Sequence, residues 1–187
     1  LWNLLNALLL LLAIYSLDKI SLTQKAFISI YVVVELLTST QNEQSNALMT
    51  ALFIFAFVFL ERDKYLPATL MLMLSVFIKI FGIVAFALFL LYPKKWKLAL
   101  YSLGWFTFLL LLPLIIVSPD QLILIYKSWW HMLNNDFSLS MGYSVMGWLS
   151  TWFGFNISKL IVLIVGVIIF IIPFIRLKEY SNYWFRL

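Results

Sequence analysis

The sequence predicts an all-α, polytopic transmembrane helix bundle. Of its 187 residues, 64% are hydrophobic and 11% are charged, whereas about 25% of a soluble domain is charged. The absence of cysteine and the presence of one histidine exclude disulfides, thiolate metal sites and histidine-rich metal sites. The net charge of +5 does not indicate a nucleic-acid partner, because basic excess in a membrane protein reports topology and contact with anionic headgroups.

We expect residues 1–187 to form a single transmembrane domain. Short polar segments separate apolar runs that are about long enough to cross a bilayer. Pro67 fits the first turn of a helix, and Pro113 and Pro173 favour bends in later spans. The predicted spans, in chain order, are residues 2–17, 26–40 and 46–60, a pair at 66–78 and 81–92, and then 98–117 and 157–175.

Residues 66–92 have two interpretations. They form either one tilted helix or two short helices that meet near Lys79 as a re-entrant hairpin. The segment after them holds Lys94, Lys95 and Lys97 without an acid, and basic loops stay cytoplasmic. The hairpin is favoured, because it places the basic segments 18–25, 61–65, 93–97 and 176–187 on the cytoplasmic side and leaves 41–45 and 118–156 outside.

The segment that follows the fifth apolar run predicts an interfacial helix over residues 119–134. Ser118, Pro119 and Gln121 give a cap, a proline at the first helical position and a capping-box glutamine. The helix is amphipathic and carries Trp129 and Trp130, so we expect it to lie at the headgroup level rather than to cross.

Lys79 is the leading candidate for a site residue. A charge in hydrocarbon costs at least a few kcal/mol unless it is paired or faces water. Snorkelling is inefficient near the middle of a long apolar run. An ion pair with Glu35 is a structural alternative, and a lipid phosphate is the functional one.

Two further groups of polar residues are candidates for substrate contacts. Glu35, Gln41, Gln44 and Asn46 lie toward the outward ends of the second and third spans. An ordinary loop with helix caps is the alternative interpretation; it fits Gln44 and Asn46 less well, because they open a helix, and it fits Glu35 least, because that carboxylate lies well inside a span. The second group lies in the interfacial helix, where a solvated face is the default and an acceptor or headgroup contact is the functional hypothesis. It comprises His131, Trp129 and Trp130.

These patterns together resemble glycosyltransferase family 87, a bacterial family of the GT-C class. The resemblance covers the chain and is clearest over residues 41–119. It rests on Gln41 or Gln44 near Asn46, on the Ile-Lys pair that ends at Lys79, and on the basic KKWK after Tyr-Pro. Many family members have a proline shortly after the lysine, whereas Phe81 and Gly82 follow it here.

The resemblance implies a GT-C-like membrane enzyme of the bacterial plasma membrane. It implies transfer of a mannose-like hexose, with inversion, from a polyprenyl-phosphate donor to a lipid or glycan acceptor on the extracytoplasmic face. Lys79 then binds the donor phosphate, and Gln41, Gln44, Asn46 and Glu35 contact the donor or its sugar. No cofactor is expected, and no metal site is assigned.

The catalytic acid of such enzymes lies in a first outer loop. The chain starts at Leu1 without methionine, so we expect an internal part of a longer protein with no catalytic residue in it. Two alternatives remain: a transporter or permease fragment, and a non-catalytic scaffold subunit. Transporters often contain repeated halves, and no repeat is visible here.

Overall fold

The structure is a computed structural model that describes residues 1–135 and 144–187. Every regular element within those ranges is a helix, which confirms the all-α prediction. The chain divides into two compact units, Leu1–Leu112 and Pro113–Leu187, and each is described by itself. The expectation of a single transmembrane domain stays a prediction.

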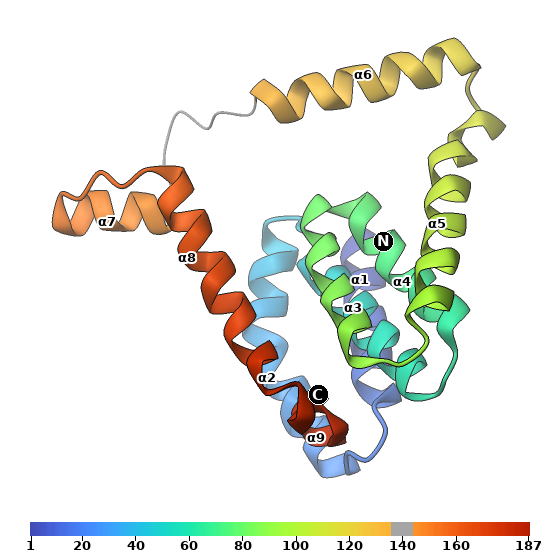
Figure 1. The fold of residues 1–187 in the computed structure, drawn as a ribbon, viewed down its shortest axis with the longest axis vertical. Coiled ribbons are helices and arrows are strands. Elements are labelled where there is room, and N and C mark those ends of the chain that lie inside the picture. Colours follow the sequence, from blue (N-terminus) through green and yellow to red (C-terminus); the bar gives the residue numbers. More distant parts are fainter. Residues whose placement is uncertain (136–143) are drawn as a thin grey trace. The chain divides into compact units, whose positions relative to one another are not determined.

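In the first unit, α3 and α4 pack against each other and make most of the contacts to the other helices (Figure 1). α3 contacts α1 on one side and α4 on the other, and α4 also contacts the 3₁₀ helix η1 and α5. The elements are α1 (Trp2–Ser16), α2 (Leu22–Gln41), α3 (Asn46–Glu61), α4 (Tyr65–Ile78), η1 (Ile80–Leu91) and α5 (Lys95–Leu111).

Two helices in this unit start three or more residues earlier than predicted. α2 begins at Leu22 rather than at residue 26, because Ser21 and Gln24 form a reciprocal capping box that starts the helix earlier. α5 begins at Lys95 rather than at residue 98, so its first turn contains two of the lysines that were predicted to lie in the loop.

Residues 66–92 form a hairpin rather than one tilted helix, whereas the re-entrant position of this hairpin in a membrane stays a prediction. α4 ends at Ile78, Lys79 is extended at φ −142° and ψ 126°, and η1 then turns back to pack along α4. Gly82 allows this reversal, because a Cβ there would lie 2.6 Å from the carbonyl carbon of Ser75 and 2.7 Å from the amide nitrogen of Val76. The second arm is a 3₁₀ helix, which the sequence did not predict.

The base of the hairpin is closed by contacts of the residues after η1 with the start of α4 and with the end of α3. The hydroxyl of Tyr92 donates to Oε1 of Glu61 at 2.6 Å, and the ammonium of Lys94 lies 5.1 Å from the ring centroid of Tyr65. In the preceding loops, Arg62 makes a bidentate ion pair with Asp18. The hairpin therefore begins and ends at the same level.

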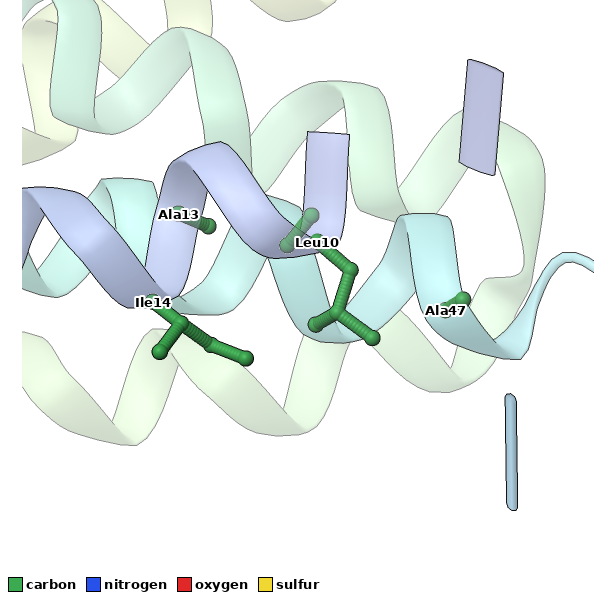
Figure 2. Packing of buried hydrophobic residues seen from close by; sticks show 5 residues of the cluster. Leu10, Ala13, Ile14 and Ala47 are labelled. Atoms are coloured by element: carbon green, nitrogen blue, oxygen red, sulfur yellow. The ribbon is translucent and has the colours of Figure 1, made fainter. Parts of the chain in front are cut away.

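The apolar core of the first unit consists of two clusters of buried side chains. Figure 2 shows the first cluster, in which Leu10, Ala13 and Ile14 of α1 meet Ala47 of α3. The alanines let the two helix backbones approach closely, as small residues do in membrane bundles. The second cluster lies at the base of the hairpin and comprises Leu60, Tyr65, Ala68, Tyr92 and Leu98.

The second unit consists of helices whose described side chains are mostly exposed. Ser118 and Gln121 form the predicted capping box before α6, whereas the interfacial position of α6 stays a prediction. Part of the predicted outer loop 118–156, residues 136–143, lies outside the described residues. The elements are η2 (Leu112–Ile115, which starts at the last residue of the first unit), α6 (Pro119–Asn135), α7 (Val145–Phe153), α8 (Lys159–Ile171), η3 (Ile172–Ser181) and α9 (Tyr183–Arg186).

Three helical segments are long and apolar enough to cross a membrane. They are Leu22–Gln41, Lys95–Ile115 and Lys159–Ser181. The last begins two residues later than predicted, where Ser158 caps α8, and continues past Pro173 as a 3₁₀ helix. The shorter apolar helices α1, α3, α4 and η1 pack against one another, so part of their apolar surface is buried within the unit.

Candidate functional site

Lys79 and Asn46 meet at the apex of the hairpin. The ammonium of Lys79 donates to Oδ1 of Asn46 at 2.7 Å, across 33 residues of sequence. The lysine is half-buried at the break between α4 and η1. Because η1 begins immediately after it, the positive end of that helix lies next to the backbone of Lys79.

Asn46 links this lysine to the turn between α2 and α3. Its amide nitrogen donates to Oε1 of Gln44 at 2.6 Å, so its amide oxygen is presented to Lys79. The three side chains form one chain of hydrogen bonds. An ammonium has three donors, and within the described part of the chain Lys79 uses one of them. Two donors are therefore available to an anion.

The ion pair considered for Lys79 is not formed. Among the described residues, Lys79 and Glu35 make no ion pair, and the lysine is held by the neutral amide of Asn46 instead. A neutral partner leaves the positive charge of the ammonium uncompensated. Binding of an anion beside the ammonium is therefore electrostatically favourable.

An apolar cavity of about 150 Å³ lies beside Asn46, between α1, α2 and α3. Glu35 and Asn46 both line it, and the remaining walls are mainly aliphatic. Glu35 itself is exposed in the C-terminal half of α2. The cavity is completed by Leu10, Val32, Leu36, Ser39, Ala47 and Thr50.

Asn6 is a residue of this region that the sequence analysis missed. It is 1% exposed, and its Oδ1 accepts the backbone N–H of Leu48 at 3.1 Å. Its own Nδ2 donates to the carbonyl oxygen of Trp2 at 2.8 Å. α3 has no side-chain cap from Ser45, so Asn6 supplies the cap from α1. A lone asparagine inside a leucine-rich helix was the one available signal.

Within the described part of the chain, Gln41 forms no hydrogen bond with Lys79, Asn46 or Gln44. Gln41 is exposed at the last position of α2. His131, Trp129 and Trp130 lie on α6 in the second unit, each with an exposed side chain. Over residues 1–135 and 144–187, no group of three His, Asp or Glu residues is arranged to hold a metal ion.

The fold and the site define a class of protein: a helical membrane protein in which a lysine and two amide side chains meet at the apex of a helical hairpin. Within that class, the chain belongs to glycosyltransferase family 87, whose sequence model matches residues 1–186. Comparison with curated proteins and with solved structures gave no match. The family indicates a membrane glycosyltransferase.

Proposed function

We propose that this glycosyltransferase takes a mannose-like hexose from a polyprenyl-phosphate donor and transfers it to a lipid or glycan acceptor on the extracytoplasmic face of a bacterial plasma membrane. The observation that carries the proposal is the Lys79 ammonium, which a neutral amide holds at the hairpin apex at 2.7 Å. A phosphate supplies the anion that this site lacks.

The proposed roles follow from the positions of the side chains. Lys79 binds the donor phosphate, and Gln44 and Asn46 orient the ammonium and offer further amide groups to the phosphate or the sugar. Glu35, in the wall of the cavity, accepts hydrogen bonds from hydroxyl groups of the sugar. Gln41, which is exposed at the end of α2, is assigned to a contact with the donor or its sugar. His131, Trp129 and Trp130 of α6 are assigned to acceptor or headgroup contacts.

During transfer, the acceptor oxygen bonds to the anomeric carbon while the bond from that carbon to the phosphate oxygen breaks. The electron pair of the broken bond leaves with the lipid phosphate, and the acceptor proton passes to a base outside this set of residues. Lys79 stabilises the negative charge that develops on the phosphate. Preorganised donors of this kind typically contribute about 10²–10³ in rate.

The test is transfer of radiolabelled sugar from a polyprenyl-phosphate donor by the full-length enzyme in membranes. We expect Lys79→Ala to lower the rate by about 100-fold or more, with normal expression, and Lys79→Arg to retain part of the activity because it keeps the charge. Lys95→Ala is the matched control, since Lys95 is an exposed lysine of the same unit. Unchanged activity of Lys79→Ala would remove the lysine from the site.

The proposed topology has its own test, because the sequence contains no cysteine. Segments 18–25, 61–65, 93–97 and 176–187 are assigned to the cytoplasm, and 41–45 and 118–156 to the outside. A membrane-impermeant maleimide should label Asn42→Cys in intact cells and Lys95→Cys only after permeabilisation. The reverse pattern contradicts the assignment.

A further inference from the structure

The base of the hairpin contains an open pocket of about 390 Å³ that the transfer reaction does not use. Its walls come from the loop before α4, the first turn of α4 and the beginning of α5. Three of the lining residues are lysines from two distant parts of the sequence: Lys64, Lys94 and Lys97.

The charges of this pocket are unbalanced. Asp63 is the one acid in its lining, and its Oδ1 accepts the hydroxyl of Tyr65 at 2.5 Å. Within the described part of the chain, none of the three lysines forms an ion pair. Lys94 lies over the ring of Tyr65, 5.1 Å from its centroid. Like charges gathered around one pocket favour an anionic ligand.

The pocket lies where a membrane-crossing helix begins. The segment Lys95–Ile115 is long and apolar enough to span a bilayer, and Leu100 and Leu103, in its second and third turns, have exposed side chains. The lysines at its start are therefore at headgroup level. Leu66 and Pro67 form an apolar wall beside them. A ligand with a phosphate and an adjoining apolar part fits this lining better than free phosphate does.

We propose that this pocket binds the phosphate of an anionic phospholipid headgroup, with Lys94, Lys97 and Lys64 as the donors. The site is separate from the one proposed for the donor lipid, because Lys79 lies at the opposite end of the hairpin. A basic pocket between membrane helices is a known setting for anionic headgroups. A lipid in it joins the loop before α4 to the start of α5.

The test measures the Tm of the purified full-length enzyme in neutral phosphatidylcholine micelles as phosphatidylglycerol is added. Phosphatidylglycerol should raise the Tm of the wild type, and Lys94→Gln/Lys97→Gln should raise the apparent Kd for this lipid about tenfold or more. Each lysine near an anionic surface contributes about a fivefold factor. Lys94→Arg/Lys97→Arg should restore binding, which shows that the charge rather than the fold was lost.

The matched control is Lys95→Gln/Lys178→Gln. It removes the same net charge but leaves every lysine of the pocket in place. The proposal is overturned if phosphatidylglycerol does not shift the wild type, or if both glutamine pairs respond equally. A shift by millimolar inorganic phosphate equal to that by phosphatidylglycerol assigns the pocket to soluble anions and also overturns the lipid proposal.

Discussion

At its apex the α4–η1 hairpin holds one half-buried lysine against a neutral amide, whereas at its base three exposed lysines surround an open pocket. The apex is fixed from outside the hairpin, because Asn46 belongs to α3 and Asn6 of α1 caps α3. The base is fixed where the chain leaves η1: Lys94 lies over the ring of Tyr65 at the start of α4, and Tyr92 donates to Glu61 at the end of α3.

This difference shows that the burial of a lysine decides whether its charge requires a specific partner. A charge below the membrane surface needs a partner brought by the tertiary fold, and its substitution is expected to affect one ligand sharply. Charges at the surface are solvated, so each contributes a small share to binding. The apex and the base should therefore respond differently to the substitutions below, which follow in order of decreasing expected effect.

Gly82→Ala should distort the chain reversal at the apex without directly changing the contacts at the base. The new Cβ would meet backbone atoms of Ser75 and Val76 at 2.6 and 2.7 Å, and backbone cannot move aside as a flexible side chain can. We expect destabilisation of about 3 kcal/mol or more, because overpacking of this kind forces the backbone to shift. Thermal unfolding in detergent would measure it.

Gly104→Ala is the control for that substitution. Gly104 lies inside α5, and a Cβ there meets nothing within 4 Å. Alanine is a better helix former than glycine by about 1 kcal/mol. Gly104→Ala should therefore be neutral or stabilising, and an equal loss in both variants would contradict the role of Gly82.

Asn6→Ala tests the apex from outside the hairpin, because it removes the cap of α3, the helix that carries Asn46. It leaves the N–H of Leu48 buried without an acceptor, which costs about 1–3 kcal/mol. The donor KM should rise as Asn46 loses its fixed position. Asn3→Ala, one turn away, removes only an exposed bond to the carbonyl of Thr40 and should have little effect. Equal effects of the two variants would argue against the capping role.

The smallest effect is expected from the ion pair of Asp18 with Arg62 near the base. The bidentate bond from Arg62 holds the pKa of Asp18 below its ordinary value of 3.8. The stabilisation is therefore present above that value and is lost as the pH falls through the lower pKa of the folded state. Both side chains are about 40% exposed, so the effect should stay below about 1 kcal/mol.

Unfolding measured from pH 7 down to pH 3 tests this pair. The wild type should lose slightly more stability over that range than Asp18→Asn, which has no carboxyl group to protonate. An identical pH dependence of the two proteins would show that the ion pair does not contribute.

Much of the hairpin could be predicted because its signals are local. Lys79 inside an apolar run and the basic segment after it indicated both the break and the return of the chain to the same side. The earlier start of α2 was also readable, since Ser21 and Gln24 have capping-box spacing. That signal was overlooked in favour of the hydrophobic run.

The contacts that fix the site could not be predicted, because they join residues far apart in the sequence. The bond between Lys79 and Asn46 and the cap from Asn6 to Leu48 depend on how α1, α3 and α4 pack. Composition identified the polar residues but not their pairing. Glu35 was one predicted partner of Lys79, whereas in the structure Lys79 donates to Asn46. The 3₁₀ form of η1 has no sequence signal that we recognise.

That 3₁₀ form has a geometric consequence. The 14 residues of α4 rise about 21 Å at the α-helical spacing, and the 12 residues of η1 rise about 24 Å at the wider 3₁₀ spacing. Wound as an α-helix, the returning arm would reach only about 18 Å. The stretched winding thus more than offsets the two residues by which η1 is shorter than α4, so that the returning arm is long enough to bring Tyr92 to Glu61.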